Sequence, residues 1–108
     1  MSQKARDLFI GPSDLVLSIA SIWEILIKVQ LGKLTLRRPA GPFVIRKLAE
    51  NGIETLPIDL DHLLVFEGLP MHHRDPFDRM LIAQALEENL PIVTGDPLFA
   101  RYPVKVIW

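Results

Sequence analysis

Three acidic residues stand where a strand-like segment gives way to a helix-like one, and their type and position suggest metal chemistry. Glu24 comes shortly after the apolar run of residues 15–19, Asp78 lies in the first turn of a later helix-like segment, and Asp96 directly follows residues 92–95. Carboxylates that converge on one point repel one another unless a cation lies between them, so such a group suits Mg²⁺ or Mn²⁺. A metal ion held there can generate hydroxide and stabilise the charge that develops on a phosphodiester. Spacing alone does not prove that the three carboxylates meet.

Each of these residues also has a simpler structural interpretation. Glu24 would be the third helical residue of a Ser-x-x-Glu capping box that begins at Ser21. Asp78 lies three residues after Asp75, where a negative charge meets the positive end of the helix dipole. Asp96 precedes a proline and therefore suits a helix cap. The local pattern leaves both interpretations open for all three.

Four neighbouring residues are candidates for supporting roles. Asp75 is chiefly the N-cap of the helix it opens, with a role beside the metal as the alternative. Thr94 supports the site through its hydroxyl or is simply a strand residue. Arg74 and Arg79 flank the acidic residues, where they would contact RNA phosphates or remain solvated surface charge.

Prolines and glycines divide the chain into short segments in which helices and strands alternate. We expect strands at 15–19, 53–58, 92–94 and 104–108, helices at 2–10, 21–31, 42–51, 59–68 and 77–89, and one or two helical turns after Asp96. This alternation predicts an α/β fold with a parallel sheet and helices on both faces. Ligands of such sheets bind at the carboxyl ends of the strands, which is where the three acidic residues lie.

Composition narrows the class of protein. The 108 residues carry a net charge of −1, are 49% hydrophobic and include no cysteine. They predict one globular domain over residues 1–108 and exclude intrinsic disorder, disulfide scaffolds and thiolate zinc sites. Without a global basic field, any nucleic-acid contact must come from a local patch. The charged start and the lack of a run of roughly 18 apolar residues predict a cytoplasmic protein that does not span a membrane.

Three ordered blocks of the sequence carry a specific resemblance. They are residues 20–34 (Ala-Ser-Ile-Trp-Glu-Ile-Leu-Ile-Lys, then Leu-Gly-Lys-Leu), residues 73–85 (His-Arg-Asp-Pro-Phe-Asp-Arg-Met-Leu-Ile-Ala-Gln-Ala), and residues 91–96 (Pro-Ile-Val-Thr-Gly-Asp) with Phe99 and the strand-like end. Together they resemble the PIN-domain (PilT N-terminus-like) toxins of the VapC type, from bacterial VapBC toxin–antitoxin modules. The resemblance covers essentially the whole chain.

The resemblance implies a three-layer α/β/α fold with a central parallel sheet and an endoribonuclease that depends on Mg²⁺ or Mn²⁺. By the same resemblance, Glu24, Asp78 and Asp96 match three of the family's four acidic site residues. The implied partners are an RNA substrate and a cognate VapB-type antitoxin. We also expect a homodimer or other self-association, because an apolar chain that lacks part of its sheet exposes more hydrophobic area.

The fourth acidic residue of the family has no match in this sequence. Family members usually begin with a short apolar strand that ends in Asp, ahead of the segment corresponding to residues 2–6. We therefore expect an N-terminally truncated domain without its first, central strand, explained by a start codon assigned too late, by repair through repacking, strand exchange or a partner chain, or by gene decay. Two functions stay open: a ribonuclease of uncertain activity, and a noncatalytic PIN-fold module that binds an antitoxin or itself.

Overall fold

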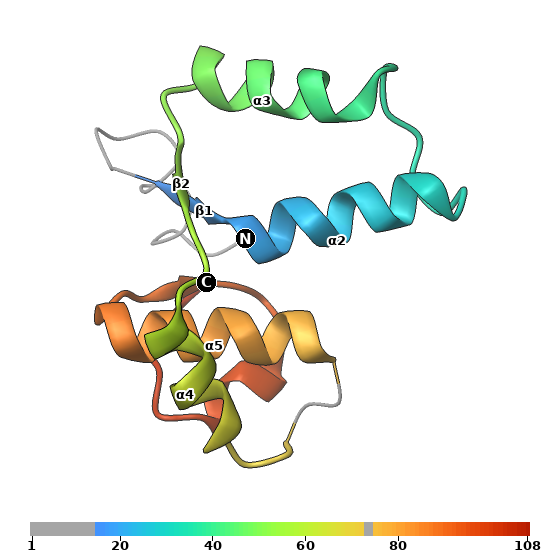
Figure 1. Cartoon of the computed structure of the whole chain (residues 1–108). Coiled ribbons are helices and arrows are strands. Elements are labelled where there is room, and N and C mark those ends of the chain that lie inside the picture. The colour runs from blue at the N-terminus through green and yellow to red at the C-terminus, as the bar shows by residue number, and fades with distance from the viewer. Residues whose placement is uncertain (1–14, 73–74) are drawn as a thin grey trace. The chain divides into compact units, whose positions relative to one another are not determined.

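The structure is a computed structural model that describes residues 15–72 and 75–108 (Figure 1). The chain divides into two compact units, which we call the N-terminal unit (Asp14–Pro57) and the C-terminal unit (Ile58–Trp108). The helix expected at 2–10 lies outside the described residues. Each unit contains two strands and at least two helices, so the α/β class predicted from the sequence is confirmed.

The N-terminal unit is built on one pair of parallel strands. Its elements are β1 (Val16–Ser18), α2 (Ile19–Gln30), α3 (Ala40–Glu50) and β2 (Glu54–Leu56). Val16 pairs with Glu54 and Ser18 with Leu56, and the two helices form the connection between the strands. The helices bury Ala20 and Val44. These four elements form one crossover unit, as the alternating pattern predicts.

Helix α2 begins earlier than the sequence pattern predicts. Its N-cap is Ser18, whose hydroxyl accepts a hydrogen bond from the Ala20 N–H at 3.0 Å. The predicted capping box that begins at Ser21 is therefore wrong, and Glu24 lies in the second turn rather than at the third position. The helix starts at once because β1 already ends at Ser18, with no linker between the two elements. The expected end is confirmed: Gly32 follows the C-cap with a φ of 73° that favours glycine.

The C-terminal unit consists of α4 (Leu60–Glu67), α5 (Pro76–Glu88), β3 (Ile92–Val93), the 3₁₀ helix η1 (Pro97–Arg101) and β4 (Val106–Ile107). Strands β3 and β4 are parallel, with Ile92 opposite Val106. Ile82, Phe99 and Tyr102 form a buried core, on which Leu69, Leu86, Ile92, Val104 and Val106 pack. This core joins α5, η1 and both strands.

The predicted helix starts in the C-terminal unit are confirmed. Asp59 caps α4, Asp75 caps α5 and Asp96 caps η1, each through its own carboxylate. Helix α5 ends at Asn89, which has a φ of 55°. Asparagine tolerates this left-handed conformation better than most residues, so the chain can turn sharply into β3.

The strands form two separate pairs where we expected one central sheet. Among the described residues, β1 pairs with β2 and β3 pairs with β4, so the structure contains two two-stranded parallel sheets. In each unit the two strands pair with each other. Neither pair has a third strand within residues 15–72 and 75–108. None of the helices described here has the length and apolar character needed to cross a membrane.

Candidate functional site

Asp96 lies in a tightly bonded loop at the carboxyl end of β3. The Thr94 N–H donates to the Ile107 carbonyl at 3.1 Å and so continues the strand pairing by one residue. The Asp96 N–H then donates to the Thr94 hydroxyl at 3.1 Å, and the Asp96 carboxylate accepts from the Leu98 N–H at 2.9 Å. The Thr94 hydroxyl thus holds the loop, and the Asp96 carboxylate caps the next helix.

Asp78 lies in the first turn of α5, half-buried, beside the residue that caps the helix. The Asp75 carboxylate accepts from the Phe77 N–H at 2.8 Å and from the Asp78 N–H at 3.3 Å. Asp75 therefore fixes the helix start, as the sequence predicts. Asp75 is the cap, and Asp78 lies in the first turn, where the helix dipole favours its negative charge.

Asp78 and Asp96 each lie one helical turn before a residue of the same apolar core. Ile82 follows Asp78 by one helical turn on the same face of α5, and it packs in the buried cluster with Phe99. The Phe99 N–H in turn donates to the Asp96 carbonyl at 3.3 Å. The core thus ties the first turn of α5 to the loop that carries Asp96. Carboxylate oxygens are the donors that Mg²⁺ and Mn²⁺ prefer, so these residue types suit such an ion.

Glu24 belongs to the other unit. It is half-buried on α2, and its carboxylate lies 3.9 Å from the Lys28 amine one turn later. The structure therefore brings two of the three predicted ligands, Asp78 and Asp96, into one unit and leaves Glu24 in the N-terminal unit.

The two candidate arginines differ. Arg79 lies half-buried in α5 with its guanidinium carbon 4.4 Å from the centre of the Phe66 ring. Its Nε is buried and has no hydrogen-bond partner among the described residues. Arg79 thus packs on the Phe66 ring of α4 with its Nε shielded from solvent, and its contact with RNA stays a prediction. Arg74 lies outside the described residues.

A second group of titratable side chains, not predicted from the sequence, connects α4 to α5. Asp59, His62 and Glu88 each have a donor atom within 4.8 Å of the others. His62 is completely buried, its Nδ1 accepts from the Asp59 N–H at 3.1 Å, and its Nε2 lies 2.8 Å from the Glu88 carboxylate. Because Nδ1 accepts, the proton sits on Nε2 and is donated to Glu88. Through these hydrogen bonds His62 connects α4 to α5, and we call this connection the His62 clamp. The Asp-x-x-His spacing of a capping box was the sequence signal that could have predicted it.

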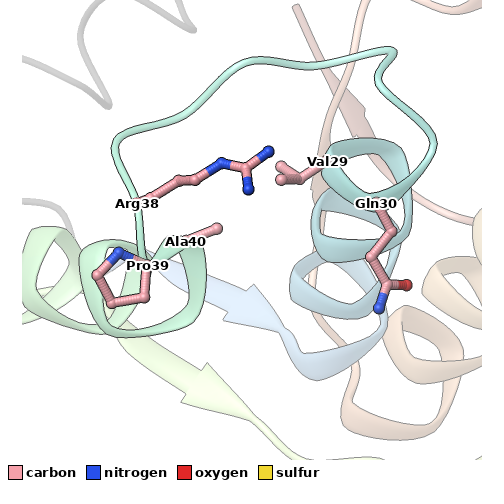
Figure 2. Close-up of a pocket in the computed structure, with 5 residues that line it drawn as sticks. All are labelled: Val29, Gln30, Arg38, Pro39 and Ala40. Atoms are coloured by element: carbon pink, nitrogen blue, oxygen red, sulfur yellow. The ribbon is translucent and has the colours of Figure 1, made fainter.

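The N-terminal unit also contains a hollow that holds no carboxylate. It is lined by Val29 and Gln30 of α2 and by Arg38, Pro39 and Ala40 at the start of α3. Figure 2 shows the Arg38 guanidinium extending across it toward Val29. With one cation and mostly apolar walls, this hollow is not a second acidic site.

Comparison with known proteins identifies the family. The model of the PIN domain matches residues 1–105. The 1-deoxy-D-xylulose 5-phosphate reductoisomerase of Cellvibrio japonicus (strain Ueda107) is 32% identical over 77 residues, which are 71% of this chain and 19% of that protein. The chain thus spans less than a fifth of the length of this curated relative. No solved structure matches significantly. Because the family model covers nearly the whole sequence, the chain belongs to the PIN-domain family, whose members are generally nucleases that bind divalent metal ions.

Proposed function

We propose that this chain is a metal-dependent endoribonuclease of the VapC type, the toxin of a bacterial type II toxin–antitoxin pair. The observation that supports the proposal is that Asp78 and Asp96, two carboxylates at a helix start and a strand end, each lie one helical turn before a residue of one buried core in a PIN-family chain. Glu24 is the third proposed ligand. The three sequence blocks that resemble VapC toxins support the choice of this type within the family.

The proposed chemistry is hydrolysis of RNA phosphodiesters. Glu24, Asp78 and Asp96 would hold Mg²⁺ or Mn²⁺, and the bound ion would supply an activated water and stabilise charge on the phosphate. The protein's own contribution is positioning. Asp75 fixes the helix start that carries Asp78, and the Thr94 hydroxyl fixes the main chain of Asp96. The finer parts of the proposal are a three-layer fold with one central sheet, a cytoplasmic location and a VapB-type antitoxin as partner.

A manganese-dependent ribonuclease assay tests this function. We expect Asp78→Asn and Asp96→Asn each to lower the cleavage rate by about 100-fold or more. Each replaces a charged carboxylate of the proposed site by a neutral amide of nearly the same size. Glu24→Gln should act in the same way if the N-terminal unit contributes a ligand. The matched control is Asp61→Asn, which removes an exposed first-turn carboxylate from α4. Equal rates for the native chain and Asp78→Asn would refute the proposal.

The second candidate is a noncatalytic PIN-fold module that self-associates. It is favoured by a row of exposed leucines on α4: Leu60, Leu63 and Leu64 lie at helical spacing on one face and are 77%, 45% and 67% exposed. Apolar rows of this kind mark protein contacts. Light scattering decides between a dimer and a monomer, and replacing Leu60 and Leu64 by serine should abolish any dimer formed through this face. A monomeric native chain would count against this candidate.

A further inference from the structure

Gly95 stands between Thr94 and Asp96, and its lack of a side chain has a specific structural cause. A Cβ atom at this position would lie 2.7 Å from Cε2, 2.9 Å from Cζ2 and 3.0 Å from Nε1 of Trp108. These distances are shorter than van der Waals contact, so any larger residue would push the indole away. Glycine therefore lets the Trp108 ring approach the main chain of the loop that carries Asp96.

The three distances also give the orientation of the ring. Cε2 is bonded to both Cζ2 and Nε1, and an atom that approached the ring edge would meet those two before it met Cε2. Because Cε2 is the nearest atom, the Gly95 main chain lies over a face of the indole. One face of Trp108 is thus occupied, yet the residue is still 47% exposed. Nearly half of the residue therefore remains open to solvent.

The position of the ring relative to the proposed ligand is fixed by the strand pairing. Val93 lies opposite Ile107, and the Thr94 N–H donates to the Ile107 carbonyl, so Trp108 follows β4 in register with the loop. The hydrogen bond between Asp96 and Thr94 holds the loop on its other side. The partly exposed Trp108 ring therefore lies against Gly95, the residue that precedes the proposed metal ligand Asp96.

We propose that Trp108 stacks on an unpaired nucleobase of single-stranded RNA, next to the phosphate that the acidic site engages. Stacking between bases and aromatic rings needs a flat, exposed and rigid ring, and it tolerates different bases because every base has a π-face. This inference rests on the proposed ribonuclease function. It makes Trp108 a substrate-positioning residue that contacts an unpaired base beside the cleaved phosphate.

The first test is binding, measured without cleavage. The sequence contains two tryptophans. In the full chain carrying Trp23→Phe, Trp108 is the remaining one, so its fluorescence reports on this position. In EDTA, an adenine hexamer should quench the fluorescence, whereas a hexamer with abasic sugars and the same phosphates should not. Equal quenching by the two oligomers, or none by either, would overturn the proposal; the latter is also the result expected if a protein partner covers the ring.

The second test uses three variants and cleavage kinetics. Trp108→Ala should raise KM for single-stranded RNA about tenfold or more with a smaller change in kcat, and Trp108→Phe should retain part of the effect. Gly95→Ala keeps the indole but displaces it, so it should resemble Trp108→Ala. Ile45→Ala removes a comparable exposed apolar side chain from α3 and should have no effect. If Trp108→Ala fails to fold, Gly95→Ala and Trp108→Phe still give the answer.

The stacking role of Trp108 and the ribonuclease function can be refuted separately. Unchanged KM in Gly95→Ala and Trp108→Phe, with cleavage that still depends on Asp96, would overturn the stacking role and leave the ribonuclease intact. Base-dependent quenching without any metal-dependent cleavage would overturn the ribonuclease and leave a single-stranded RNA contact at Trp108.

Discussion

The His62 clamp gives the sharpest prediction for stability. His62→Ala removes a completely buried imidazole that accepts from the Asp59 N–H at 3.1 Å and bonds Glu88 at 2.8 Å. It also removes a polar neighbour of the buried Gln84 amide, 3.4 Å away. Because this side chain is half of the capping box of α4 and also contacts α5, its loss should be felt in global unfolding.

The magnitude follows from these contacts. Loss of the acceptor for a part-buried N–H and of half of a capping box costs about 1 kcal/mol. The cavity left by a fully buried ring costs about 2 kcal/mol more. The lost contact with Glu88 adds little to the cost, because the Glu88 side chain is 38% exposed and its carboxylate can be hydrated in the variant. We expect His62→Ala to lower the free energy of unfolding by about 3 kcal/mol, or the Tm by about 15 °C.

Urea and thermal unfolding followed by circular dichroism measure this change. His72→Ala is the matched control, because that histidine is exposed and its ring makes a T-shaped contact with Tyr102; it should cost less than about 1 kcal/mol. Glu88→Gln keeps an acceptor for Nε2–H and should also be mild. A loss below about 1 kcal/mol for His62→Ala would refute the clamp. A native Tm that falls in EDTA, with no such fall in His62→Ala, would show instead that the group holds a metal.

Three smaller predictions concern the C-terminal unit. Asp96→Ala should cost about 1 kcal/mol in urea unfolding because the Leu98 N–H loses its cap, whereas Asp96→Asn keeps an acceptor and should cost a few tenths; an Asp96→Ala loss as small as that of Asp96→Asn would mean that the cap is unimportant. Tyr102→Phe should cost about 1 kcal/mol because its hydroxyl donates to the Pro70 carbonyl at 2.9 Å, and an unchanged midpoint would contradict this. Ile82→Ala should cost about 3 kcal/mol, because Ile82 is fully buried at the centre of the core, and a loss under about 1 kcal/mol would place the core elsewhere.

The sequence predicted the elements of the C-terminal unit well because their starts are encoded locally. An aspartate followed by proline or by an apolar residue caps α4, α5 and η1 in the structure as it does in the pattern. The same reasoning failed at α2, where Ser18 and Ser21 are equally good caps. The choice between them depends on where β1 ends, and that is set by its pairing with β2, far along the chain.

The acidic residues were recognised from the sequence by type and by resemblance, and their roles remain a proposal. The sequence determined the family, because the pattern of caps, apolar runs and carboxylates is local and spans nearly the whole chain. The tertiary structure alone decided the rest. His62 is buried against α5, Arg79 packs on Phe66, and Trp108 lies against Gly95. These contacts join residues distant in sequence, so their energies depend on packing and strand register, which no local pattern contains.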